Sequence, residues 1–293
     1  MGLVTRHLER LVLDPELDAE LREVGFTLAV PLLDEAEVEA LRRLHSQLVR
    51  LVGEPEGPWF TTGMIAERDT RRWIFDAVGE IVLPRLTELL GPSAKAMSGN
   101  LHVNPVHDGG GLGPHQDIAI VDETVSSTLN AWVGLSDTSE ENGALRFVPC
   151  SHRFGNVDRS LATPWAFEGL HEVFWANSVR VEAQAGQVIL FDTATIHCST
   201  PNRSGEPRAA ANALVRHRDQ PLQHLVARGD DDVDVYRIDE AFLVEDDVTS
   251  APSAGRGHVI ATRRRVRPPA DRSTIERLCQ EGMALLEDRR VGT

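Results

Sequence analysis

The chain has 293 residues, of which 41% are hydrophobic and 26% are charged, and its formal net charge at pH 7 is −15. Such a length permits one large domain or two small ones, and the acidic balance argues against nucleic acid or an anionic membrane as a partner. No apolar run is long enough to span a bilayer, and the three widely spaced cysteines form no disulfide framework, so we expect a cytoplasmic protein.

The first part of the chain is predicted to be helical. We expect helices over 15–24, 34–52 and 70–90, and a short β-strand over 25–30. Asp34 can cap the second helix, whose apolar residues recur at helical spacing. Pro84 is expected to kink or break the third helix, because proline lacks an N–H donor and clashes with the preceding turn.

From residue 97 onward the pattern changes to short alternating runs separated by Gly, Asn and Pro turns. We expect strands over 100–104, 118–120, 127–135, 144–149, 179–182, 187–191 and 208–217. Many short strands joined by such turns indicate a mainly β fold, either a β-sandwich or a jelly roll. The preceding helices would then pack on the outside of one sheet.

Two segments depart from the strand pattern. Residues 153–177 carry many aromatic side chains, and a long insertion at a barrel mouth is where a substrate lid would lie. Residues 219–293 are mixed: the charge runs 230–232 and 263–265 are expected to be solvated surface, and 274–286 an amphipathic helix. We expect a single domain with a helical flank (1–96), a jelly-roll core (97–218) and a C-terminal extension (219–293).

The most informative feature is the run His115-Gln116-Asp117, read together with His197 and Arg208. In a strand, residues i and i+2 point to the same face, so His115 and Asp117 can reach one metal ion. Two histidines and a carboxylate are the ligands of mononuclear non-haem Fe(II) oxygenases, which leave positions open for a co-substrate and O2. An arginine such as Arg208 can grip a dicarboxylate co-substrate. His-x-Asp alone is a weak signal.

The surrounding sequence makes the pattern more specific. Residues 130–137 (NAWVGLSD) and 141–153 (ENGALRFVPCSHR) precede His197, which is followed by an Asn-x-Ser turn and, eleven positions on (208 − 197), by Arg208. From about residue 28 to residue 217, the chain resembles the phytanoyl-CoA dioxygenase-like family of Fe(II)/2-oxoglutarate-dependent oxygenases. The resemblance implies a double-stranded β-helix, the cupin-like jelly roll.

The resemblance also implies the roles of the site residues. His115, Asp117 and His197 would be the catalytic Fe(II) ligands, and Arg208 would pair with the far carboxylate of 2-oxoglutarate.

Three further residues would line the co-substrate site in this resemblance, namely Trp132, Ser199 and His102. Each has a structural alternative: a core aromatic for Trp132, a turn hydroxyl for Ser199 and an ordinary polar residue for His102. The glycine run 109–113 lacks the Lys-Ser/Thr of a phosphate-binding loop and is expected to be a flexible loop at the site mouth.

The implied activity is oxidation, most simply hydroxylation, of an unactivated C–H bond in a small-molecule metabolite, with 2-oxoglutarate and O2 giving succinate and CO2. Related halogenases lack the carboxylate, so Asp117 favours hydroxylation or another oxidation. Asn104-Pro105 replaces the Lys-Pro of many family members, and no acyl-CoA substrate is implied. A natural-product pathway is plausible by association only.

Two alternatives remain open. One is a cupin-like protein that binds a metal or ligand without oxygenase activity, and the other is a metal-dependent hydrolase that uses the same ligands. Arg208 at its family spacing favours the oxygenase, because a hydrolase has no need of it. The sequence does not define the oligomeric state.

Overall fold

The computed structural model describes residues 10–106, 111–267 and 271–291. Its helices are α1 (Pro15–Glu23), α2 (Glu35–Val52), α3 (Arg68–Leu89), α4 (His171–Ala176), α5 (Phe242–Glu245) and α6 (Arg272–Val291), with short 3-10 turns η1 (Thr62–Met64) and η2 (Ser151–Arg153). Its strands are β1 (Val30–Pro31), β2 (Phe60–Thr61), β3 (Ala94–Asn104), β4 (Thr128–Gly134), β5 (Leu145–Phe147), β6 (Val179–Val181), β7 (Gln187–Asp192), β8 (His197–Ser199), β9 (Arg208–His217), β10 (Gln223–Arg228), β11 (Asp232–Ile238) and β12 (Gly257–Arg264).

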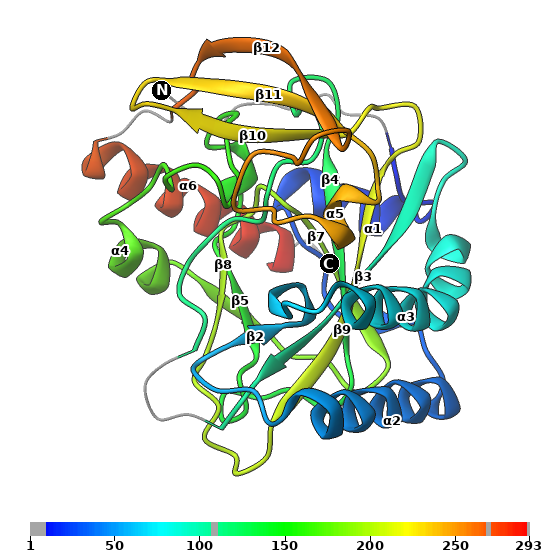
Figure 1. The fold of residues 1–293 in the computed structure, drawn as a ribbon. Helices are drawn as coiled ribbons and strands as arrows, with labels where there is room; N and C mark the ends of the chain where they lie inside the picture. Colours follow the sequence, from blue (N-terminus) through cyan, green and yellow to red (C-terminus); the bar gives the residue numbers. More distant parts are fainter. Residues whose placement is uncertain (1–9, 107–110, 268–270, 292–293) are drawn as a thin grey trace.

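Two antiparallel sheets enclose the interior (Figure 1). The larger has the order β1-β7-β4-β9-β3-β2 and the smaller the order β6-β5-β8. Side chains of both sheets meet in one apolar cluster that includes Trp132 and Phe191 from the larger sheet and Phe147 from the smaller. This is the jelly-roll architecture with flanking helices that the sequence predicts.

Strand β4 shows how the larger sheet separates core from site. Alternate residues point to opposite faces. Leu129, Ala131 and Val133 pack with apolar residues of α2 and α3 on the outer face. Asn130 and Trp132 therefore point into the interior, where polar side chains can serve a site.

The N-terminal helices cover that outer face. Asp34 caps α2 in a capping box with Glu37, as the sequence predicts. Helix α3 continues through Pro84, so the prediction of a break there is wrong. Ile74 and Val82, like the other apolar residues of its buried stripe, are fully buried, and this packing outweighs the lost N–H donor.

The expected strands over 127–135, 144–149, 179–182, 187–191 and 208–217 correspond to β4, β5, β6, β7 and β9. The strand expected over 25–30 is wrong, apart from an isolated bridge at Phe26 and Val30, the first residue of β1. Thr27 explains the failure. Leu190 N donates to the Thr27 hydroxyl (3.1 Å) rather than to a main-chain carbonyl, which interrupts the ladder.

The strand expected over 118–120 is also absent. Ala119 N donates to Arg159 O (3.0 Å), and Gln223 N donates to Ile120 O (2.8 Å). Because these partners come from different segments, no continuous ladder forms. The segment that follows Asp117 is therefore irregular, and its conformation depends on contacts from elsewhere in the chain.

The C-terminal extension contains a third sheet, β10-β11-β12, which the sequence reading missed. It lies at the top of Figure 1, above the jelly roll. The alternation of Asp and Val at the start of β11 was the available signal, since Val233 and Val235 are buried whereas Asp232 and Asp234 are not. Arg263 is exposed, as expected for the charge run, and it also pairs with the buried carboxylate of Asp158 at 2.6 Å.

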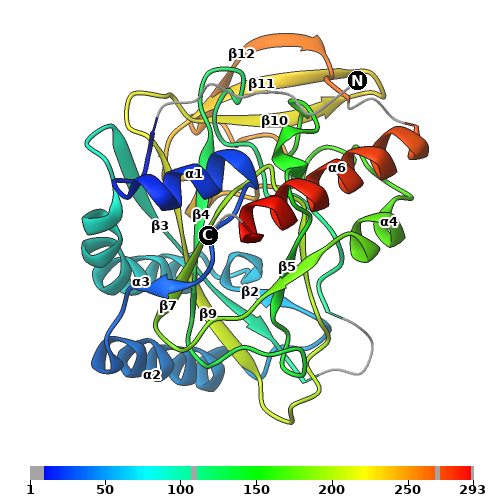
Figure 2. The same ribbon diagram turned by 180° about the vertical axis from the view of Figure 1, so that it is seen from behind.

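The insertion 153–177 packs against α6, and Figure 2 shows α4 beside that helix. Phe154, Phe167 and Phe174 are buried in a cluster with Ile275 and Leu278 of α6. These aromatic side chains are core residues, so they no longer support a lid or indicate an apolar substrate. Among the described helices, none combines the length and the hydrophobicity needed to cross a bilayer.

Candidate metal centre

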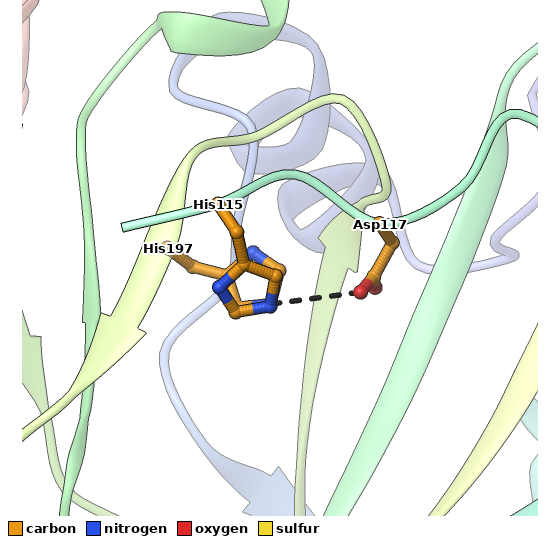
Figure 3. A group of neighbouring side chains, drawn as sticks. All are labelled: His115, Asp117 and His197. Carbon is orange, nitrogen blue, oxygen red and sulfur yellow. Dashed lines mark ion pairs between the residues drawn. The ribbon is translucent and has the colours of Figure 1, made fainter. Parts of the chain in front are cut away.

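His115, Asp117 and His197 come together inside the jelly roll (Figure 3). His197 opens β8 and forms an isolated bridge with His115, whose N–H donates to His197 O at 3.0 Å. His197 Nε2 lies 3.8 Å from Asp117 Oδ1. One ligand atom from each of the three residues lies within 4.8 Å of the other two, so a single metal ion can contact all three.

Main-chain carbonyls select the tautomer of both histidines. His115 Nδ1 lies 2.8 Å from Gly113 O, and His197 Nδ1 lies 3.0 Å from Thr195 O. Since a carbonyl only accepts hydrogen bonds, each Nδ1 carries the proton and each Nε2 keeps its lone pair. This arrangement is typical of metal-ligating histidines.

Asp117 is held from three sides. Its N–H donates to Thr193 O (3.0 Å), and its carbonyl accepts from Arg159 Nε (2.9 Å). The Asn130 amide donates to Asp117 Oδ2 at 2.9 Å. Oδ1 is therefore the oxygen that faces the histidines and is available as a ligand.

The protonation states suit a divalent cation. Burial, together with the neighbouring His197, lowers the pKa of His115 to about 4, so this ring is neutral at pH 7. Burial acts to raise the pKa of Asp117, but the two histidines and the Asn130 amide outweigh it and hold this pKa below its ordinary value. Two imidazoles and a carboxylate are a ligand set that fits Fe(II).

Arg208 is a buried cation in the same interior. It begins β9, is 3% exposed, and donates from Nη2 to Gly143 O at 2.8 Å. Its Nε is buried without a hydrogen-bond partner, and no carboxylate among the described residues lies within ion-pair distance. Burial lowers the pKa of Arg208 to about 10, which still leaves it charged at pH 7.

A pairing of Arg208 with a surface acid such as Glu206 is thus excluded. An unpaired buried charge is costly unless an anion offsets it. The orphaned Nε is therefore the feature of this interior that fits a bound carboxylate.

Trp132 and His102 both lie near Arg208. The Arg208 guanidinium lies over the Trp132 ring. On β3, Asn104 is opposite Arg208 and His102 is opposite Ala210. Burial lowers the pKa of His102 to about 4, and Asp117, Arg208 and His197 all lie close enough to influence it electrostatically.

Ser199 is placed differently. Its hydroxyl accepts from Leu112 N (3.1 Å), and its N–H donates to Leu112 O (3.0 Å). Ser199 therefore holds the segment that leads to His115. A Cβ on Gly111 would lie 2.1 Å from Ser199 O, so glycine is required there. Gly109 and Gly110 of the expected flexible loop lie outside the described residues.

Three residues near the site were not assigned a role from the sequence. Asn130 lies on the same strand face as Trp132, and that spacing could have identified it. Trp59, whose ring centroid is 5.8 Å from that of His102, and Arg159 are contributed by distant segments, so no local pattern points to them.

Comparisons with known proteins agree with this geometry. A family model described as Phytanoyl-CoA dioxygenase (PhyH) matches residues 21–210, a range that contains His115, Asp117, His197 and Arg208. A Dictyostelium discoideum protein, "Phytanoyl-CoA dioxygenase domain-containing protein 1 homolog", is 32% identical over 130 residues. That alignment covers 41% of this chain and 46% of the relative, so the chain spans about half the length of that protein.

Two further comparisons cover more of the chain. "Ectoine dioxygenase" of Halomonas elongata is 26% identical over 232 residues, which is 70% of this chain and 70% of that protein. The solved structure of "the epimerase SnoN in complex with Fe3+, alpha ketoglutarate and nogalamycin RO" matches with a TM-score of 0.51 and 20% identity, covering 84% of this chain and 94% of that one. At this identity the structural match supports the jelly-roll fold alone.

Proposed function

Because this chain belongs to the phytanoyl-CoA dioxygenase family, we propose that it is an Fe(II)/2-oxoglutarate-dependent dioxygenase that oxidises a small molecule. One observation carries the proposal beyond family membership. The same interior that brings His115, Asp117 and His197 together also contains Arg208, a buried guanidinium with an unpartnered Nε. A metal site alone would not need this second feature, whereas a dicarboxylate co-substrate requires both.

His115 Nε2, Asp117 Oδ1 and His197 Nε2 would hold the iron. When bound, iron in such a site supplies redox chemistry with O2 that side chains cannot provide. The protein's own contribution is positional. Carbonyl acceptors orient both imidazoles, and Asn130 leaves one carboxylate oxygen facing the metal position.

Arg208 would bind the far carboxylate of 2-oxoglutarate. Its Nε is free to donate, and a charge-assisted hydrogen bond in a dry interior is stronger than a neutral one. Trp132 covers the guanidinium and excludes water from it. His102 lies near Arg208 and, because it is neutral at pH 7, can donate one hydrogen bond and accept one. Ser199 contributes indirectly, because its hydrogen bonds with Leu112 hold the segment that leads to His115.

We propose hydroxylation of a C–H bond as the reaction, because Asp117 keeps the carboxylate ligand that related halogenases lack. The relative described as an ectoine dioxygenase and the neighbour described as an epimerase both act on small molecules by name, so a small-molecule substrate is part of the proposal. Their names differ in reaction type, and the shared fold does not select between such outcomes.

A metal-dependent hydrolase is the main rival, and the choice of metal separates the two. Purified protein would be incubated aerobically with 2-oxoglutarate and ascorbate, with either Fe(II) or Zn(II), and succinate would be measured. The proposal expects succinate with Fe(II) only, and none from the His197→Ala variant. A protein that forms no succinate but hydrolyses ester substrates with Zn(II) would support the hydrolase instead.

A further inference from the structure

We propose that Arg159 and Glu123 form a buried positioning pair that sets the main chain of the metal ligand Asp117. This inference rests on the proposed metal-binding role of Asp117. It gives the insertion 153–177 a role at the metal centre that does not depend on any motion over the substrate.

The pair is buried and bidentate. Arg159 Nη1 lies 2.5 Å from Glu123 Oε2, and Nη2 lies 2.6 Å from Oε1, while the two side chains are 4% and 5% exposed. The remaining nitrogen, Nε, donates to Asp117 O at 2.9 Å. All three guanidinium nitrogens are thus engaged, and one of them reaches the residue proposed to bind metal.

The contacts close a ring around Asp117. Glu123 Oε1 accepts from the Thr193 hydroxyl at 3.5 Å, and Thr193 O in turn accepts from Asp117 N at 3.0 Å. Both peptide groups that flank Asp117 are therefore tied to the same ion pair, the carbonyl through Arg159 and the N–H through Thr193. The Arg159 carbonyl also accepts from Ala119 N, which fixes the chain two residues further on.

This ring replaces what a sheet would otherwise provide. Asp117 lies in an irregular segment whose only bridge is at His115, so no strand ladder determines its backbone conformation. A displacement of Asp117 would move Oδ1 relative to the two histidines. The Arg159–Glu123 ion pair opposes such a displacement, because Arg159 of the insertion holds the Asp117 carbonyl.

Stability alone does not account for a buried ion pair here. Removing two charges from water is costly, and an apolar pair of similar volume is often equally stable. Contacts that orient metal ligands, in contrast, typically change metal affinity 10–100-fold when they are removed. The structure thus predicts that the pair can be replaced with little effect on folding and a large effect on metal binding.

The experiment uses the double variant Arg159→Met/Glu123→Leu, which leaves neither charge unpaired. Two quantities are measured on metal-free protein: the thermal unfolding temperature and the Mn(II) dissociation constant from anaerobic titration calorimetry. We expect an unfolding temperature close to that of the wild type and Mn(II) binding weakened by about 10–100-fold. Wild-type Mn(II) affinity in the folded double variant would overturn the proposal.

A matched control uses Asp158 of the same insertion and its partner Arg263 on β12. Arg263 and Asp158 also form a bidentate pair, at 2.6 and 2.7 Å, but contact none of the proposed ligands. Arg263→Met/Asp158→Asn should leave Mn(II) affinity unchanged, and an equal loss in this variant would also overturn the proposal.

Two further variants keep the test decisive. If the double variant does not fold, Arg159→Lys takes its place. The lysine keeps a cation paired with Glu123 but cannot also reach Asp117 O, so weakened Mn(II) binding is again expected. Undiminished binding would contradict the inference. If Mn(II) binding persists in His197→Ala, the proposed metal site itself is wrong, and the inference fails with it for that separate reason.

Discussion

The guanidinium of Arg208 lies over the ring of Trp132, with 5.1 Å between its Cζ atom and the ring centroid. A cation over an aromatic face is stabilised, but the ring supplies no acceptor for Nε–H. The contact therefore holds Arg208 in place but leaves its Nε–H without a hydrogen-bond acceptor. We propose that Trp132 and Arg208 together form a preorganised receptor for one carboxylate.

Replacing Arg208 with methionine should weaken 2-oxoglutarate binding. Loss of one partner from a buried charge-assisted pair costs about 2–5 kcal/mol, which corresponds to about 30-fold or more in the dissociation constant. Anaerobic titration of the Fe(II) protein with 2-oxoglutarate measures this dissociation constant. The exposed Arg203, which the structure places in the turn after Asn202, is the control. If Arg203→Met weakens binding and Arg208→Met does not, the wrong arginine has been assigned.

Replacing either His115 or His197 with alanine should abolish metal binding and turnover while the fold persists. The two apolar clusters on either side of the larger sheet include none of the three proposed ligands, so we expect the jelly roll not to depend on the metal ion. Circular dichroism and Mn(II) titration check the two parts of this prediction. His258→Ala, on the exposed face of β12, should bind metal normally. Metal bound stoichiometrically by His197→Ala would rule out the assignment.

Replacing Asn130 with alanine should move metal binding to higher pH. The Asn130 amide is one of the groups that lower the pKa of Asp117, so its removal raises that pKa. Protons and metal compete for the carboxylate, and binding is lost as pH falls. The acid midpoint of Mn(II) binding is therefore expected at higher pH in the variant than in the wild type. An unchanged midpoint would mean that Asp117 is not a ligand. Asn177→Ala, whose amide contacts only the main chain of α4, serves as the control.

Replacing Pro84 with alanine should stabilise the protein. Pro84 is exposed inside α3, so the change creates no cavity, and alanine is a far better helix former. Part of the gain is offset because proline also restricts the unfolded chain. We expect the free energy of unfolding in urea to rise by about 1 kcal/mol. A lower value would indicate that α3 requires its present geometry at that position.

Elements with a local signal were predictable from the sequence. The Asp34 capping box and apolar spacing determine α2, and the apolar run of β9, which only Asn212 interrupts, identifies a buried strand. Residues 25–30 and 118–120 have strand-like patterns, but their hydrogen bonds go to a side chain or to scattered partners. Such partners follow from tertiary structure, which a local pattern does not contain.

The candidate site shows the same division. His115, Asp117, His197 and Arg208 could be chosen because each stands at a characteristic spacing, and the structure brings them into one interior. Arg159 could not be chosen, because it approaches Asp117 from 42 residues away along the chain. Its contacts with the Glu123 carboxylate and with the Asp117 carbonyl leave no pattern in the sequence.

Under the proposed function, iron and 2-oxoglutarate bind together in this interior. The most direct measurement is an anaerobic absorption titration of the metal-free protein with Fe(II) and 2-oxoglutarate. A co-substrate that chelates Fe(II) produces a visible charge-transfer band, and neither component does so alone. We predict this band in the wild type, its absence in His197→Ala, and a higher 2-oxoglutarate requirement in Arg208→Met. A wild-type protein that binds Fe(II) but develops no band with saturating 2-oxoglutarate would contradict the proposed function.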